Sequence, residues 1–96
     1  MENKVLLCNL YDYYFVLLTD QQQLFFKYYY FDDLSLSEIG FSFGVSRNAV
    51  YSCLKGVVTK LKDFELKLKL YEKSIAIKKI IKDIDDNVKK EINNLI

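Results

Sequence analysis

Residues 36–55 read Leu36-Ser-Glu-Ile-Gly-Phe-Ser-Phe-Gly-Val-Ser-Arg-Asn-Ala-Val-Tyr-Ser-Cys-Leu-Lys55. This order of apolar, small and turn-forming residues is typical of a helix-turn-helix. Ile39 gives the first short helix an inward apolar residue, and Gly40 is small enough for a second helix to cross closely. Gly44 tolerates the left-handed backbone that the turn requires, and Ser46 caps the second helix. The stretch therefore predicts two short helices that cross at a steep angle.

The second of these helices is expected to bind nucleic acid, because recognition helices reach base edges from their N-terminal ends. Arg47 can pair with guanine edges and Asn48 with adenine edges, or either can hold a phosphate. Residues 34–56 carry a net charge of only +1, so a motif used as a scaffold or a protein-docking surface is the alternative. The candidate nucleic-acid-binding residues are Ser46, Arg47, Asn48, Tyr51, Ser52 and Lys55.

The composition of the 96-residue chain excludes several classes of function. There is no His, which removes the Ser-His-Asp and Cys-His relays and His-bearing metal sites. The two cysteines cannot form a four-cysteine zinc site. Asp32 and Asp33 suit a capping loop better than an acid–base pair. We therefore expect a protein that is not an enzyme and that needs no metal and no cofactor.

The net charge of +1 hides an uneven distribution along the chain. Residues 1–54 sum to −3, whereas residues 55–96 contain eleven lysines and sum to +4. The second half is therefore expected to supply phosphate or acidic-partner contacts, with Lys60, Lys62 and other tail lysines helping Arg47. A solvated Lys/Glu helix face would explain the same lysines.

The cellular setting is predicted from the chain start and the cysteines. The residues after Met1 do not resemble a signal peptide, and no apolar run approaches the roughly 20 residues that a membrane span needs. Cys8 and Cys53 lie among apolar residues, which is typical of reduced core cysteines. We expect a cytoplasmic protein without membrane insertion.

Helix start signals predict an all-α chain of four to six helices. Thr19 with Gln22, and Ser35 with Glu38, have the spacing of capping boxes. The fold class expected is a helix-turn-helix domain, winged-helix-like or like region four of sigma factors, with a long C-terminal helical extension.

The C-terminal extension has no Gly and no Pro after residue 56, so residues 57–96 are expected to be helical, as one helix or as two. A break is predicted between Tyr71 and Ser74, with Ser74 as the cap of the last helix. We accordingly divide the chain into a helix-turn-helix domain, residues 1–73, and a C-terminal amphipathic helix, residues 74–96, packed on that domain or on a partner.

The last segment carries one apolar stripe at alternating steps of four and three residues. This stripe predicts either a homodimer or packing against the core of the same chain. Its members are Ile77, Ile81, Ile84 and Val88.

Two aromatic clusters, residues 11–15 and 28–31, are expected to fill the interface between the first two helices. Stacking of single-stranded bases is the alternative. Because consecutive helical positions cannot all face inward, some tyrosines must lie at the surface, and an exposed Tyr13 or Tyr30 would suit a protein contact.

The sequence resembles the YlxM family, small helix-turn-helix proteins associated with the signal recognition particle. The resemblance covers about residues 10–73. The strings that carry it are Leu10-Tyr-Asp-Tyr-Tyr14, Leu17-Leu-Thr-Asp-Gln-Gln22, Tyr28-Tyr29, Asp32-Asp-Leu-Ser-Leu-Ser-Glu-Ile39, Val45-Ser-Arg-Asn-Ala-Val-Tyr51, Phe64-Glu-Leu-Lys-Leu68 and Leu70-Tyr-Glu-Lys73.

The resemblance implies a sigma-region-four-like helical domain that regulates the signal recognition particle pathway by contact with its RNA or its GTPase, and that is DNA-binding by fold. It carries over the motif residues 46–51. The alternative is a protein-interaction module that binds the GTPase, or a sigma-like partner, without nucleic-acid contact. This chain departs from the family after Ile39, where residues 40–43 replace Ala and acidic residues, and Phe41 becomes a candidate exposed aromatic residue.

Overall fold

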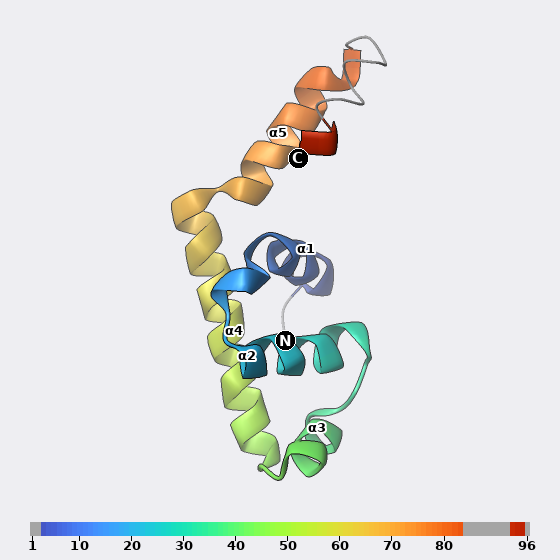
Figure 1. Ribbon diagram of the computed structural model, residues 1–96, viewed down its shortest axis with the longest axis vertical. Helices are drawn as coiled ribbons and strands as arrows, with labels where there is room; N and C mark the ends of the chain where they lie inside the picture. Colours follow the sequence, from blue (N-terminus) through green and yellow to red (C-terminus); the bar gives the residue numbers. More distant parts are fainter. Residues whose placement is uncertain (1–2, 84–92, 96) are drawn as a thin grey trace.

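The computed structural model describes residues 3–83 and 93–95, and the all-α prediction is confirmed (Figure 1). Within these ranges there is no strand, so no wing accompanies the helix-turn-helix. None of the described helices is both long and apolar enough to cross a membrane. The elements are α1 (Lys4–Tyr14), the 3-10 turn η1 (Phe15–Leu17), α2 (Asp20–Phe26), the π-helical turn η2 (Lys27–Phe31), α3 (Leu36–Phe43), α4 (Arg47–Leu68), α5 (Leu70–Ile80) and the 3-10 turn η3 (Ile81–Asp83).

Helix α4 is the spine of the molecule, with 22 residues and a length of about 33 Å. In Figure 1, α3 lies at its N-terminal end, α2 near its middle and α1 further along. Val50, Leu54, Val57 and Leu61 follow each other at helical spacing and are fully buried. They form the single apolar stripe on which the three preceding helices pack.

Both predicted capping boxes are present. The Thr19 backbone N–H donates to Gln22 Oε1 over 2.9 Å, and the Gln22 N–H donates back to Thr19 Oγ1 over 3.2 Å. The matching distances between Ser35 and Glu38 are 3.1 and 3.0 Å. These local hydrogen bonds satisfy the free N–H groups of α2 and α3 and fix where each helix begins.

The crossing of α3 and α4 depends on the absence of a side chain at Gly40. A Cβ placed there would lie 2.6 Å from the carbonyl oxygen of Val45, which belongs to the backbone of the turn. Gly44, at the end of α3, adopts the left-handed conformation with φ of 69°. Both predictions for the turn glycines are therefore confirmed, whereas Val45 is 37% exposed and contributes little to the core.

The break in the C-terminal extension occurs at Lys69, before the predicted range. Lys69 is left-handed, with φ of 55°, and α5 begins at the next residue. Ser74, expected as a cap, is instead 5% exposed inside α5, and its hydroxyl has no partner among the described residues. The prediction was wrong because the cap of α5 comes from Glu65, near the end of α4, and from Tyr14, which is distant in the sequence.

Two side chains from other helices cap α5. The Glu65 carboxylate accepts the backbone N–H groups of Tyr71 at 3.1 Å and Glu72 at 3.0 Å. The Tyr14 hydroxyl accepts the Leu70 N–H at 2.9 Å and donates to Glu65 at 2.5 Å. Burial and then the hydrogen bond to Glu65 raise the pKa of Tyr14, so its hydroxyl keeps the proton that it donates.

The aromatic clusters form core, and of the two tyrosines considered for a surface contact, Tyr30 is buried. Residues 27–31 form a π-helical turn, and the Asp32 N–H donates to the Lys27 carbonyl. This wider turn rotates Tyr30 inward, where it is 4% exposed and burial raises its pKa to about 12. Tyr13 is half-buried and lies against Tyr71, with ring centres 5.9 Å apart.

The apolar stripe predicted in the tail is described only in part. Ile81 is 4% exposed and Ile77 is half-buried, which favours packing on the chain's own residues. Ile84 and Val88 lie outside the described residues.

The two helix glycines without a left-handed backbone give a matched pair of predictions. Gly40→Ala should lower the free energy of unfolding by about 1–3 kcal/mol, because its methyl group meets a backbone carbonyl. Gly56→Ala should raise it by about 0.5–1 kcal/mol, because a Cβ there has open space and alanine favours the helix. Urea titration of both variants measures the difference, and equal effects would contradict the close crossing.

Candidate nucleic-acid interface

The candidate interface is the N-terminal end of α4, which the turn holds against α3. Ser46 is extended, with φ of −72° and ψ of 157°, and its hydroxyl accepts the Ala49 N–H at 3.0 Å. The Ser46 carbonyl accepts the Val50 N–H at 3.2 Å. The prediction that Ser46 caps this helix is confirmed. The backbone N–H groups of Arg47 and Asn48 belong to the first helical turn, where a helix has no internal acceptors for them.

All six candidate residues are exposed along the first three turns of α4. Arg47, Tyr51 and Lys55 follow one another at four-residue steps, so they form one ridge on the helix surface. Asn48 and Ser52 form the neighbouring ridge. The structure therefore brings the candidates together on one continuous face; Tyr51 is 41% exposed.

The inward side of the same helix holds this face in place. Val50 and Leu54 are fully buried, whereas Cys53, which was expected in the core, is only half-buried. Burial raises the pKa of the Cys8 and Cys53 thiols. Both therefore remain protonated at neutral pH and are poor nucleophiles or metal ligands.

The two cations of the face are available to an anion. In the part of the chain that the structure describes, neither Arg47 nor Lys55 forms an ion pair. Glu38, the acidic residue of α3, uses its carboxylate in the capping box. The face thus offers two positive charges and several neutral hydrogen-bonding groups.

The lysines of α5 lie far from this face. The prediction that the tail lysines help Arg47 was therefore wrong for the lysines of α5. Lys73, Lys78 and Lys79 lie on α5, at the opposite end of α4 from Arg47 (Figure 1). Since α4 continues without a break through Gly56, about 33 Å of helix separates its two ends. Lys60 is nearer, and its Nζ lies 3.5 Å from Gln22 Oε1 on α2.

Phe41 is the second feature of the motif that bears on function. Its side chain is 92% exposed on the outer side of α3, which confirms the prediction made from its departure from the family pattern. A phenyl ring in water is costly unless a partner covers it.

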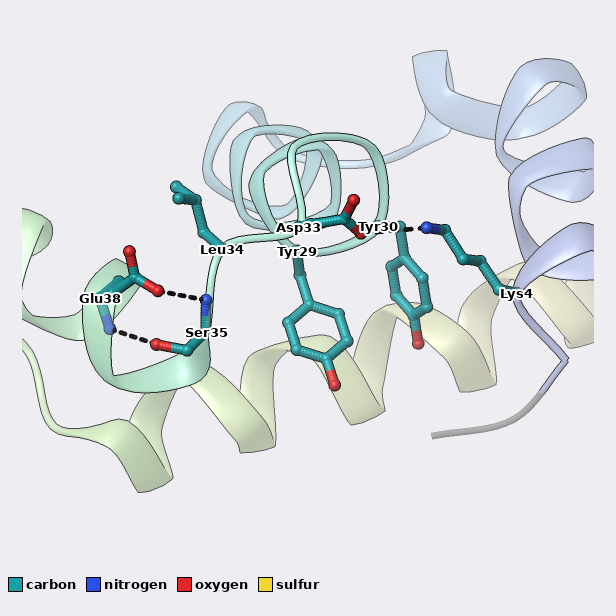
Figure 2. A pocket seen from close by; sticks show the side chains of 7 residues that line it. All are labelled: Lys4, Tyr29, Tyr30, Asp33, Leu34, Ser35 and Glu38. Carbon is teal, nitrogen blue, oxygen red and sulfur yellow. Dashed lines mark hydrogen bonds and ion pairs between the residues drawn. The ribbon is translucent and has the colours of Figure 1, made fainter.

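A mixed-polarity cavity of about 430 Å³ lies elsewhere, between the start of α1, the η2 turn and the start of α3 (Figure 2). Lys4 Nζ lies 3.1 Å from Asp33 Oδ1 at one side, and the Ser35–Glu38 capping box borders the other. Its charged and capping groups already bind one another. This cavity could not be predicted from the sequence, because it borders Asp33, whose backbone is left-handed with φ of 57°.

The model of the UPF0122 family, described as "Putative helix-turn-helix protein, YlxM / p13 like", matches residues 1–95. A UPF0122 protein of Streptococcus gordonii is 42% identical over 82 residues, 85% of this chain and 74% of that protein. One of Streptococcus thermophilus is 45% identical over 75 residues, covering 78% and 68%. One of Fusobacterium nucleatum is 36% identical over 101 residues, covering 100% and 98%.

Two substitutions at Ser46 test whether its side chain stabilises the start of α4 as a cap. Ser46→Ala should cost about 1 kcal/mol of unfolding free energy, because the Ala49 N–H loses its acceptor. Ser46→Asp should stay within a few tenths of a kcal/mol of the parent chain, because a carboxylate caps equally well and suits the helix dipole. Thermal unfolding followed by circular dichroism compares them, and a destabilised Ser46→Asp would contradict the capping role.

Proposed function

We propose that this chain, which belongs to the UPF0122 family, is a regulatory helix-turn-helix protein. It would bind nucleic acid through the first three turns of α4. The observation that carries the proposal is the close approach of the α4 start to Gly40 of α3. This packing leaves Arg47, Asn48 and Lys55 exposed on one face of α4. We further propose that it acts in the cytoplasm and not as an enzyme.

The face suits a groove of a nucleic acid in a definite orientation. The free N–H groups and the positive dipole of the α4 start favour a phosphate there. The Arg47 guanidinium and the Asn48 amide are the side chains with bidentate hydrogen-bonding geometry for base edges. Tyr51, Ser52 and Lys55 continue along the same face toward the backbone.

The small number of charges limits the electrostatic part of binding. With Arg47 and Lys55 as the phosphate-competent cations, a slope of about −2 is expected for the logarithm of affinity against the logarithm of salt concentration. The ligands that we propose are DNA or the RNA of the signal recognition particle, which would place the chain in that pathway.

Mutation of Arg47 tests the proposal. Arg47→Ala should weaken binding by about 1–3 kcal/mol, and Lys55→Ala should reduce the salt slope by about 1. Lys78→Ala, an exposed lysine on α5, is the charge-matched control and should bind like the parent chain. Fluorescence anisotropy at several salt concentrations, with a mixed-sequence DNA duplex and with signal recognition particle RNA, measures both quantities.

Absence of salt-dependent binding to either nucleic acid would overturn this proposal. Ser46→Asp adds a further control, because it should keep the fold yet repel a phosphate at the start of α4.

The alternative function is a protein-interaction module that binds the signal recognition particle GTPase or a sigma-like protein without nucleic acid. The exposed Phe41 ring favours it, because buried aromatic anchors dominate many protein interfaces.

Phe41 separates the two functions. If the chain is a protein-interaction module, Phe41→Ala should abolish capture of the purified GTPase, whereas the double variant Arg47→Ala, Lys55→Ala should retain it. Val16→Ala, at a position 69% exposed on η1, is the control for loss of an exposed apolar side chain. Stability should change by less than about 0.5 kcal/mol in these surface variants, so a loss of binding reports on contact.

A further inference from the structure

The junction between α4 and α5 is a left-handed residue within a stretch of sequence that favours helix. Lys69 has φ of 55°, and this conformation lowers the population of a lysine about tenfold relative to the right-handed helix. Residues 57–96 contain neither Gly nor Pro, so the local sequence does not require α4 to end there. Figure 1 shows the chain changing direction between α4 and α5. Contacts from other parts of the chain must therefore hold the bend.

Three consecutive backbone N–H groups after the bend are bonded to side chains. The Leu70 N–H donates to the Tyr14 hydroxyl over 2.9 Å. The N–H groups of Tyr71 and Glu72 donate to the two oxygens of the Glu65 carboxylate, over 3.1 and 3.0 Å. Because the Tyr14 hydroxyl also donates to Glu65, the two acceptors are joined. Tyr14 and Glu65 together form the lock of the bend.

The same three N–H groups would have ordinary helical acceptors if α4 continued without a bend. In an α-helix each N–H bonds to the carbonyl four residues earlier, which for residues 70–72 means the carbonyls of residues 66–68. The bonds on either side already follow this rule, because the Lys69 N–H donates to the Glu65 carbonyl and the Lys73 N–H to the Lys69 carbonyl, each over 2.9 Å. The bend thus exchanges three backbone hydrogen bonds for three bonds to side chains.

We propose that this junction is a two-state hinge, in which the bent chain interconverts with a straight one. In the straight state α4 and α5 form a single helix from Arg47 to Ile80, Lys69 is right-handed and the lock is released. The same N–H groups are bonded in both states, so the balance depends on two opposed quantities. The left-handed lysine favours the straight state, whereas the lock and the contacts of α5 with α1 favour the bent one.

The hinge controls which part of α1 is covered. In the bent state the ring centre of Tyr71 lies 5.9 Å from that of Tyr13, and the Tyr71 hydroxyl lies 3.5 Å from Asn9 Nδ2. Straightening separates Tyr71 from both residues, because α5 then follows the axis of α4. The start of α4 lies at the opposite end of that helix, so the hinge uncovers a surface of α1 without changing the proposed nucleic-acid face.

Nuclear magnetic resonance of the isotopically labelled full chain distinguishes the two states. In the straight state, contacts between the α-proton of residue i and the amide proton of residue i+3 cross the junction, from residue 67 to 70 and from 68 to 71, as in any helix. The left-handed Lys69 interrupts these contacts in the bent state. The parent chain should be bent and lack them.

Removal of the lock should straighten the chain. The double variant Tyr14→Phe, Glu65→Ala keeps the buried ring but deletes all three side-chain acceptors, so the N–H groups return to helical carbonyls and the contacts across the junction should appear. Tyr13→Phe, Glu72→Ala is the matched control, which removes the same two groups from neighbouring positions and should stay bent. Unchanged amide signals of Glu38 and Ala49, in the two caps around the turn, report that the variants remain folded.

A third substitution tests the left-handed residue itself. Added to the lock-free double variant, Lys69→Gly should shift the balance back to the bent state by about tenfold, because glycine adopts positive φ freely and disfavours helix. Lys69→Ala, at the same exposed position, should leave that variant straight. A lock-free variant that stays bent, or equal effects of Lys69→Gly and Lys69→Ala, would overturn the inference.

Discussion

The backbone contact at the helix crossing is the constraint on which the rest of the molecule depends. Gly40 permits the Val45 carbonyl to approach where a Cβ would stand 2.6 Å away. That approach sets the start of α4, because Ser46 follows directly and caps it. Once α4 is placed, its buried stripe of Val50, Leu54 and later residues determines where α2 and α1 can pack.

The two ends of α4 are held by different physical means. At the start, a local hydroxyl and a short turn fix the backbone, and the side chains of the first turns are left in solvent. At the far end, Tyr14 and Glu65 bring groups from α1 and α4 itself to the first N–H groups of α5. The exposed face at the start of α4 and the capped junction with α5 thus lie at opposite ends of the same helix.

Features that depend on neighbouring residues could be predicted from the sequence. The capping boxes, the Ser46 cap, the left-handed Gly44 and the exposed Phe41 each follow from a few adjacent residues and their own chemistry. Membership in the family was equally accessible, because the matching strings run through most of the chain.

Features that depend on distant contacts could not be predicted. Next to the bend at Lys69, the Leu70 N–H donates to the hydroxyl of Tyr14, which lies 56 residues away along the chain. The inward turn of Tyr30 follows from one extra residue in a helical turn, which side-chain periodicity does not reveal. The separation of the α5 lysines from Arg47 follows from the unbroken length of α4, which Gly56 does not interrupt.

The shared hydroxyl of Tyr14 has a mechanical consequence. This hydroxyl donates to Glu65 and accepts from Leu70. The orientation of α5 therefore depends on α1, which carries Tyr14, as well as on α4. Helix α5 has 11 residues and is about 16 Å long. Because the hydroxyl of Tyr14 and the carboxylate of Glu65 together hold the start of this helix, a tilt of about 10° at that start would move its far end by about 3 Å.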